Sequence, residues 1–294
     1  MADLFIYATI CIIFLILHGC ILFVLFYRRK DFKSSYYTII TFLTISDLSI
    51  IAYNLYRGIR SKIISYTLET RHDILSKMII FTNLSSGWYP SLFFNVLVAL
   101  NRYVAIRYYS EYKIRMSLFR TKILILIAYL ICALLISPVF LTKSDIKTCK
   151  VAILTREKLD CDIFSRIFFI SNVIFTLFVL FSIISLYFAA IVYSIICIRK
   201  RKKCPNGMIT AGSNTNFNYF NLREQKLLAQ GVVLGLTLIV AELVFWFNSE
   251  KKKMLTAYRL FFVVYAGLQA YTVFALANCT CRASPKSSIL SSSI

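Results

Sequence analysis

Seven long apolar segments constrain this chain more than any other feature of its sequence. Each segment has 19 or more residues and at most one charged side chain. An α-helix rises about 1.5 Å per residue, so about 20 apolar residues cross a hydrocarbon core of about 30 Å. The sequence therefore predicts an all-α integral membrane bundle of seven transmembrane helices, forming one domain over residues 1–294. The expected spans are 4–27, 36–56, 78–103, 123–141, 167–198, 227–248 and 260–278.

The composition agrees with burial in lipid. Hydrophobic residues make up 59% of the chain and the mean hydropathy is +0.72, whereas soluble domains are about 45–50% apolar. The formal net charge is +21. These basic residues lie at the ends of membrane-length segments, where anionic lipid and cytosolic partners meet them. We therefore expect membrane lipid as a partner and no nucleic acid.

The basic residues also indicate how the helices are oriented. The first apolar segment ends at Arg28-Arg29-Lys30, and the fifth ends at the cluster from Arg199 to Lys203. Lys and Arg are enriched in cytoplasmic loops. With the N-terminus outside, 19 Lys and Arg residues fall in cytosolic segments and 15 in external ones. We expect an external N-terminus, a cytosolic C-terminus and a multi-pass location in the plasma membrane.

The third apolar segment ends in Asn101-Arg102-Tyr103. A guanidinium group is permanently charged and presents a fork of hydrogen-bond donors. At the inner end of a buried helix, neighbours can hold such a group in one state and release it to a cytosolic partner in another. The alternative is an anchor whose side chain extends to the lipid headgroups. The position at the end of the third of seven helices favours a switch made of these three residues.

Asp47 lies near the middle of the second segment. Inserting an aspartate at that depth costs about 2.5–3.5 kcal/mol, and such residues usually face the bundle interior and serve a function. Asn95, Ser46 and Thr44 are expected to hydrogen-bond to it. The alternative is a polar contact that only packs the helices together, and one residue can fill both roles.

A ligand cavity is expected in the outer half of the bundle. Glu242 in the sixth segment can meet a cationic or hydrogen-bonding ligand there, or instead pair with Arg259 or carry a proton. Other side chains at comparable heights are candidates to line the cavity, although aromatic residues more often serve packing. They are Tyr53, Trp88, Tyr89, Trp246, Tyr265 and Gln269.

The nine cysteines lack both the paired spacing and the neighbouring histidines of a metal site, so we expect no metal and no cofactor. Cys149 and Cys161 stand in one predicted external loop, where they can form a disulfide or remain free thiols. Cys279 and Cys281 lie beside the membrane on the cytosolic side. Their spacing suits palmitoylation, with unmodified thiols as the alternative.

Asn101-Arg102-Tyr103 resembles the Asp/Glu-Arg-Tyr motif of rhodopsin-like G-protein-coupled receptors, with Asn101 in place of the acid. A narrower resemblance is to nematode serpentine chemoreceptors of the Srg superfamily, with the Srg and Srv families as candidates. It is carried by residues 29–38, by Ile45-Ser46-Asp47-Leu48 and by Leu100-Asn101-Arg102-Tyr103. The resemblance implies a chemosensory receptor in sensory-neuron membranes. Such a receptor binds a small-molecule or peptide ligand and activates a heterotrimeric G protein.

Two other classes of function are weighed against a receptor. A transporter or channel can use intramembrane Asp47 and Glu242 in a proton or ion path, but the two acids lie on different helices and no third acid relays between them. An enzyme is not expected. The only histidines are His18 and His72, and the chain has neither an HExxH nor a GxSxG motif.

Overall fold

The computed structural model of this chain is helical wherever it describes a regular element. The described residues are 2–27, 34–63, 78, 81–108, 111–140, 163–203, 232, 235, 236 and 240. The long helices in this part are α1 (Ala2–Tyr27), α2 (Ser35–Ile63), α4 (Tyr89–Arg107), α6 (Leu118–Ile136) and α8 (Ile163–Lys203). The shorter elements are the π-helical turn η1 (Leu84–Trp88), α5 (Tyr112–Arg115) and the 3-10 turn η3 (Ser137–Phe140).

These helices match the first five predicted spans, with ends that differ by several residues. The apolar run that predicts the fourth span begins at Ile123, but α6 begins at Leu118. Its start is set by Ser117, whose hydroxyl accepts a hydrogen bond from the backbone N–H of Arg120 at 3.3 Å, the usual geometry of an N-cap. At its other end Pro138 lies in η3, because proline cannot continue the α-helical hydrogen-bond pattern.

The sixth and seventh predicted spans lie mostly outside the described residues. Residues 232, 235, 236 and 240 of the sixth span are helical. Val232 packs against the same cluster as α8, and Gly235 lies close to Ile183 and Tyr187 of α8. The predicted positions of the two termini relative to the membrane remain predictions.

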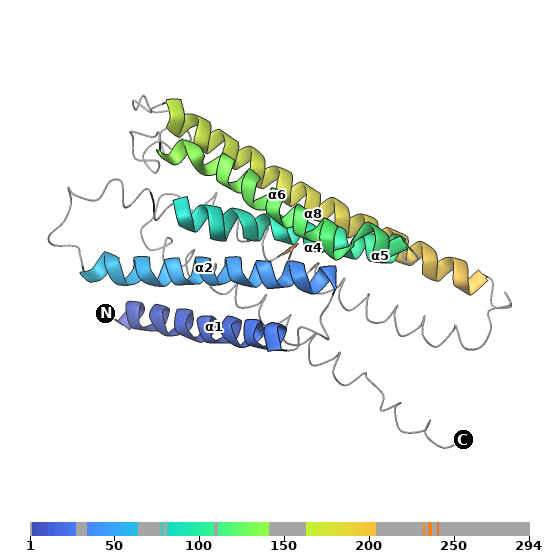
Figure 1. Ribbon diagram of the computed structural model, residues 1–294, viewed down its shortest axis with the longest axis horizontal. Coiled ribbons are helices and arrows are strands. Elements are labelled where there is room, and N and C mark those ends of the chain that lie inside the picture. Colours follow the sequence, from blue (N-terminus) through green and yellow to red (C-terminus); the bar gives the residue numbers. More distant parts are fainter. Residues whose placement is uncertain are drawn as a thin grey trace, which may run out of the picture.

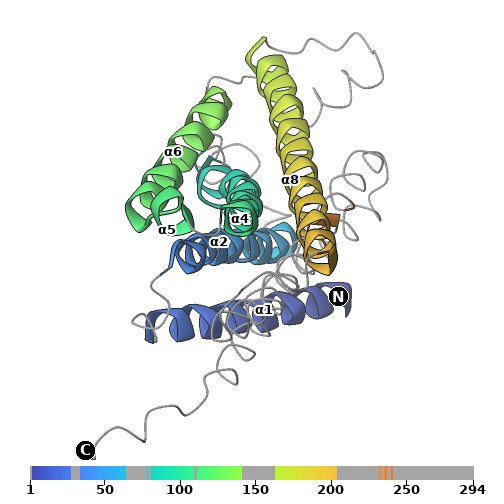
Figure 2. The same cartoon turned by 90° about the vertical axis from the view of Figure 1, so that its right-hand side faces the viewer.

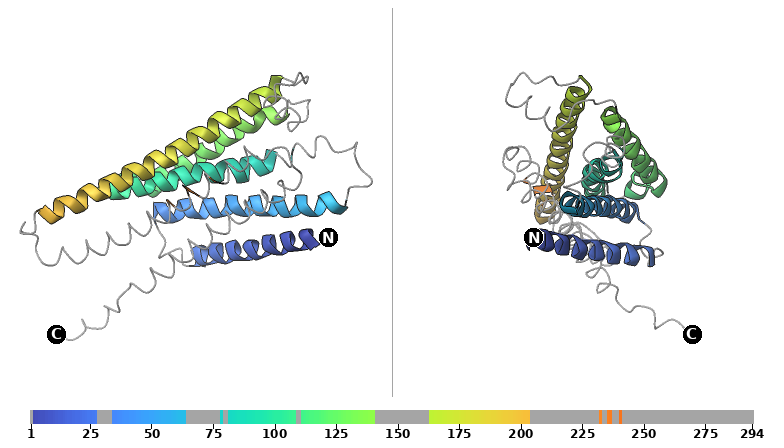
Figure 3. Two further views of the ribbon diagram at one scale, coloured as in Figure 1. Left: turned by 180° about the vertical axis from the view of Figure 1, so that it is seen from behind. Right: turned by 90° about the vertical axis from the view of Figure 1, so that its left-hand side faces the viewer.

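The long helices alternate in direction. Helices α1, α4 and α8 run one way, and α2 and α6 run the other way (Figure 1; Figure 3 shows the same arrangement from behind). The end of α4 that carries Arg102 therefore lies near the starts of α2 and α6. We call this the Arg102 end of the bundle.

Helix α4 lies in the middle of the described bundle (Figure 2). It contacts α2, α6 and α8, while α1 packs on the far side of α2. Four segments are long and apolar enough to cross a membrane by length and composition, namely Tyr7–Tyr27, Ser35–Tyr56, Leu118–Ile136 and Arg166–Ile196. The third predicted span is not one of these four. Its polar residues are tolerated because protein, not lipid, surrounds it.

The helices at the outside of the bundle differ from α4, which carries polar residues and is enclosed by protein. They turn large apolar side chains outward, among them Phe23 of α1, Leu134 of α6 and Phe181 of α8. A helix that is apolar on its outward face as well as its inner face suits a lipid environment. The polarity of the bundle is therefore concentrated along its centre.

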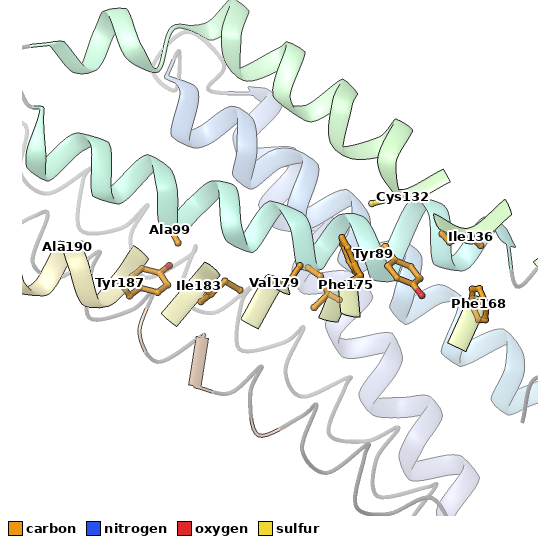
Figure 4. Packing of buried hydrophobic residues seen from close by; sticks show 11 residues of the cluster. Tyr89, Ala99, Cys132, Ile136, Phe168, Phe175, Val179, Ile183, Tyr187 and Ala190 are labelled. Carbon is orange, nitrogen blue, oxygen red and sulfur yellow. The ribbon is translucent and has the colours of Figure 1, made fainter. Parts of the chain in front are cut away.

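The main apolar cluster joins α4, α6 and α8 (Figure 4). Its α8 members recur at spacings of three, four or seven residues, so they form one helical face directed at α4. The buried residues of this cluster are Tyr89, Leu92, Ala99, Cys132, Ile136, Phe168, Phe175, Val179, Ile183, Tyr187 and Ala190. A second cluster joins α1, α2, α4 and α6 around Phe94 and Leu97.

The close approach of η1 to α2 gives a first testable prediction. A Cβ atom added to Gly87 would lie 3.0 Å from Ile50 Cγ1 and 3.4 Å from the Ile50 backbone nitrogen, whereas one added to Gly19 meets nothing within 4 Å. Overpacking of this kind costs about 1–3 kcal/mol. We expect Gly87→Val to lower the Tm of the purified protein and Gly19→Val to leave it nearly unchanged. Equal Tm values for both variants would contradict this packing.

Candidate functional site

Arg102 is almost fully buried at the end of α4, with 4% of its surface exposed. Its guanidinium carbon lies 3.6 Å from the centroid of the Tyr36 ring, which comes from the first turn of α2. A cation this close to an aromatic face is attracted by the ring's electron density, by about 0.5–2 kcal/mol depending on desolvation. The side chain is thus packed against a neighbouring helix and does not extend outward as a headgroup anchor.

Asn101 is held by a closed ring of neutral hydrogen bonds. Its Nδ2 donates to Ser35 Oγ at 3.0 Å, and Tyr112 Oη donates to Asn101 Oδ1 at 3.2 Å. Ser35 Oγ and Tyr112 Oη are 2.9 Å apart, and Ser35 is the donor because the Tyr112 proton is already used. The ring joins α4, α2 and α5 without any ion pair.

Tyr103 faces a different neighbour. Its hydroxyl accepts a hydrogen bond from Arg107 Nη1 at 2.7 Å. This hydrogen bond is the main reason that the pKa of Arg107 is raised. The Arg107 guanidinium also lies within 6 Å of the rings of Tyr108 and Tyr193, the latter on α8. The three residues of the predicted switch therefore point to three different partners.

Asp47 lies at a polar site in the middle of the bundle and is 1% exposed. Ser91 Oγ of α4 donates a hydrogen bond to Asp47 Oδ1 at 2.8 Å. His18 of α1 is equally buried, and its Nε2 lies 4.0 Å from Asp47 Oδ2. The aspartate thus faces the bundle interior, as predicted, and links three helices.

The expected partners of Asp47 are partly wrong. Thr44 Oγ1 donates to the backbone oxygen of Ile40, and Ser46 Oγ makes no hydrogen bond to Asp47. A serine or threonine in a helix commonly bonds to the carbonyl one turn earlier, which removes its hydroxyl proton from other use. The Asn95 side chain donates to the backbone oxygen of Ser91 at 2.8 Å, so it lies beside the residue that does bond Asp47.

His18 and Ser91 were missed by the sequence analysis. Each is a single polar residue in an apolar segment, and no spacing relates either one to Asp47. The polar residues that clamp the end of α4, Ser35, Tyr36 and Tyr112, were missed for the same reason. Only the rule that polar groups in lipid must find partners inside the protein would have suggested them.

The outer candidate residues are only partly described. Tyr89 is 2% exposed and packs between helices: its hydroxyl donates to Asn172 Oδ1 at 2.7 Å, and its ring lies 5.3 Å from that of Phe175 (Figure 4). Trp88 packs against the α4–α8 cluster, and Tyr53 is half-buried on α2. The remaining candidate residues lie outside the described part: Glu242, Trp246, Tyr265, Gln269, Cys149, Cys161, Cys279 and Cys281.

The turn η1, at the opposite end of the third span from Arg102, is a feature that the sequence did not predict. A π-helical turn inserts one residue into an α-helix and often marks a functional site. Asn83 precedes this turn, and its Oδ1 is buried without a hydrogen-bond partner. Next to it, Gly87 allows α2 to approach closely. The outer part of the third span therefore carries a hydrogen-bond acceptor that the described residues do not satisfy.

Comparison with known families identifies the class of protein. Residues 19–291 match the family model described as 7 transmembrane receptor (rhodopsin family). The chain therefore belongs to the rhodopsin family of seven-transmembrane receptors. No curated protein matches the sequence.

Membership in this family defines the coarse function. The protein is a multi-pass receptor of the plasma membrane that signals through G proteins, and its partners are a ligand and a G protein. Family membership also points to a receptor without enzymatic activity.

The Asp47 site gives a second testable prediction. Ser91→Ala removes the one hydroxyl that donates to the buried carboxylate, and a hydrogen bond to a charged group contributes about 1.5–3 kcal/mol. We expect a clear loss of Tm in the purified receptor. Ser182→Ala is the matched control, because the Ser182 hydroxyl is exposed and bonds only to the backbone of its own helix. A Ser91→Ala variant as stable as the control would contradict the hydrogen bond to Asp47.

Proposed function

We propose that this receptor is chemosensory and that Arg102 is its G-protein switch. A small ligand in the outer half of the bundle favours an arrangement in which the first turn of α2 moves away from α4. Arg102 is then released from Tyr36 and becomes available to a heterotrimeric G protein. The observation that carries the proposal is the burial of a permanently charged guanidinium on the face of Tyr36, at 3.6 Å.

Two adjacent residues of α2 hold two adjacent residues of α4. Ser35 accepts a hydrogen bond from Asn101, and Tyr36 covers Arg102. We call these two contacts the α2 clamp. Because both come from one helical turn, a single displacement of α2 relative to α4 opens both. Tyr112 of α5 bonds to both Asn101 and Ser35, so the same displacement also breaks at least one of these two hydrogen bonds.

An acid at position 101 would offer an ion pair to Arg102. In this chain Asn101 has no charge, and the α2 clamp takes the place of that ion pair. A cation–π contact contributes about 0.5–2 kcal/mol, and a difference of about 1.4 kcal/mol changes an equilibrium constant tenfold. The contact with Tyr36 therefore favours the resting state by only a modest amount. A ligand needs only a small differential affinity for the active arrangement to shift the population.

The ligand site is proposed around η1. Asn83 Oδ1 supports a ligand that carries a hydrogen-bond donor, and Trp88 offers an aromatic wall. Glu242, Trp246, Tyr265 and Gln269 are proposed to complete the cavity from the sixth and seventh spans. A donor-bearing small molecule or peptide fits both Asn83 and the carboxylate of Glu242.

The remaining finer assignments stay proposals that rest on the sequence. The similarity to nematode serpentine chemoreceptors supports expression in sensory-neuron membranes. A disulfide between Cys149 and Cys161 and palmitoylation of Cys279 and Cys281 are expected features of the external loop and the cytosolic tail. Family membership favours a receptor over a transporter or channel, and an absence of ligand-independent current or uptake in proteoliposomes is the corresponding expectation.

The α2 clamp predicts the basal activity of variants at Tyr36. Tyr36→Leu removes the aromatic face, so we expect basal G-protein nucleotide exchange to rise about 2- to 30-fold, the range that corresponds to about 0.5–2 kcal/mol. Tyr36→Phe keeps the ring and should stay near the wild-type level. The measurement is guanine-nucleotide binding in membranes, normalised to the amount of receptor. Equal exchange by Tyr36→Leu and Tyr36→Phe would rule out the aromatic contact as a restraint.

The role of Arg102 is tested in the Tyr36→Leu variant, in which the contact between Arg102 and the Tyr36 ring is already removed. Adding Arg102→Ala to Tyr36→Leu should return nucleotide exchange to background, because the group that engages the G protein is then missing. Arg107→Ala in the same background is the matched control for loss of one inner cation. A double variant that reaches the membrane and still activates the G protein would remove Arg102 from the mechanism.

A further inference from the structure

His18 and Asp47 form a pair that the proposed switch does not use. Both side chains are 1% exposed, and His18 Nε2 lies 4.0 Å from Asp47 Oδ2. They come from neighbouring helices, α1 and α2, which pack along their lengths (Figure 1). His18 is the only histidine of these two helices, and Asp47 is the only acid of α2.

The histidine ring is held so that one nitrogen faces the aspartate. His18 Nδ1 lies 2.9 Å from the backbone oxygen of Phe14. A carbonyl oxygen only accepts hydrogen bonds, so Nδ1 carries a proton. Nε2 then either has a free lone pair or carries the second proton of an imidazolium. It has no hydrogen-bond partner among the described residues.

Charge balance fixes how many protons the pair holds. If neither Nε2 nor Oδ2 carries a proton, the pair is a buried carboxylate beside a neutral imidazole, with net charge −1. If both atoms carry a proton, the pair is a carboxylic acid beside an imidazolium, with net charge +1. Either charge costs several kcal/mol in a dry interior. With one proton the pair is neutral, whether that proton is on Nε2 or on Oδ2.

The charged residues of the helices packed around the pair lie toward the helix ends in the described part of the chain. They are Asp3 on α1, Arg57, Arg60 and Lys62 on α2, Arg102 and Arg107 on α4, and Arg120 and Lys122 on α6. Along α2, Arg57 is ten residues from Asp47, about 15 Å away. Helix α4 adds the neutral Ser91 and Asn95. Arg102 is eleven residues from Ser91 along α4, about 16 Å away.

We propose that His18 and Asp47 form a buried proton-binding site, which holds one proton between Nε2 and Oδ2 and ties α1 to α2. Ser91 donates to the other carboxylate oxygen, so the proton site extends to α4. The 4.0 Å separation is closed by a small movement of either side chain or bridged by one water molecule. An imidazole beside the carboxylate disfavours a hard metal cation there, because such ions prefer oxygen ligands.

The first test uses the fact that the chain has only two histidines, His18 and His72. In a receptor carrying His72→Gln and labelled with nitrogen-15 at histidine, all imidazole signals come from His18. We expect Nδ1 to be protonated and Nε2 to show a hydrogen bond, as donor or as acceptor. A bare Nε2 without a hydrogen bond would overturn the proposal.

The second test is a double-mutant cycle on the thermal stability of the purified receptor. His18→Leu and Asp47→Asn each leave a buried polar partner behind, so each should lower the Tm. The double variant should lose clearly less than the sum of the two single losses. Additive losses would mean that the two side chains do not share a proton, and would overturn the proposal.

A third measurement separates a proton from a metal cation. The Tm of the wild-type receptor is compared in sodium chloride and in choline chloride at equal ionic strength. We expect no difference. A sodium-dependent gain in Tm that disappears in Asp47→Asn would place a metal ion at the carboxylate and overturn the proposal. All three measurements need neither a ligand nor a G protein, so their outcome is independent of the proposed switch.

Discussion

A single constraint governs this molecule: a polar group placed inside a lipid bilayer must find its partner within the protein. Helix α4 meets this constraint by lying at the centre of the bundle, covered by α2, α6 and α8. Ser91, Asn95 and Asn101 bond to protein atoms there, and Arg102 rests on an aromatic ring. The helices around α4 turn large apolar side chains outward and direct their own polar residues, such as His18 and Asp47, inward. Position in the bundle thus determines which helix faces can hold functional residues.

The features of α4 and the turn before it are arranged in order along the membrane. The π-helical turn with Asn83 lies farthest from the Arg102 end, the Asp47 and Ser91 contact lies near the middle, and the α2 clamp lies at the Arg102 end. Helix α2 is the partner in every case, through Ile50, Asp47, Ser35 and Tyr36. A change in the packing of α2 against α4 at the outer end is therefore carried to Arg102 by two helices that already touch along their length.

Most of the helical architecture follows from the sequence, because apolar length is a direct consequence of bilayer thickness. The first five spans, the buried position of Asp47 and the position of Arg102 at a helix end were all predictable in this way. Helix ends were less predictable: α6 begins early because Ser117 caps it, and α8 continues as one helix through the basic residues to Lys203. The contacts were least predictable. Ser35 and Tyr112 meet Asn101 across 66 and 11 residues of sequence, and a single polar residue gives no sign of which distant partner it will meet.

The ring formed by Asn101, Ser35 and Tyr112 has one more consequence. None of its members carries a charge, so dissolved ions do not screen it as they screen an exposed ion pair. At the Arg102 end this ring therefore holds α2, α4 and α5 together at low and at high ionic strength alike. Displacement of a helix, and not added salt, breaks it.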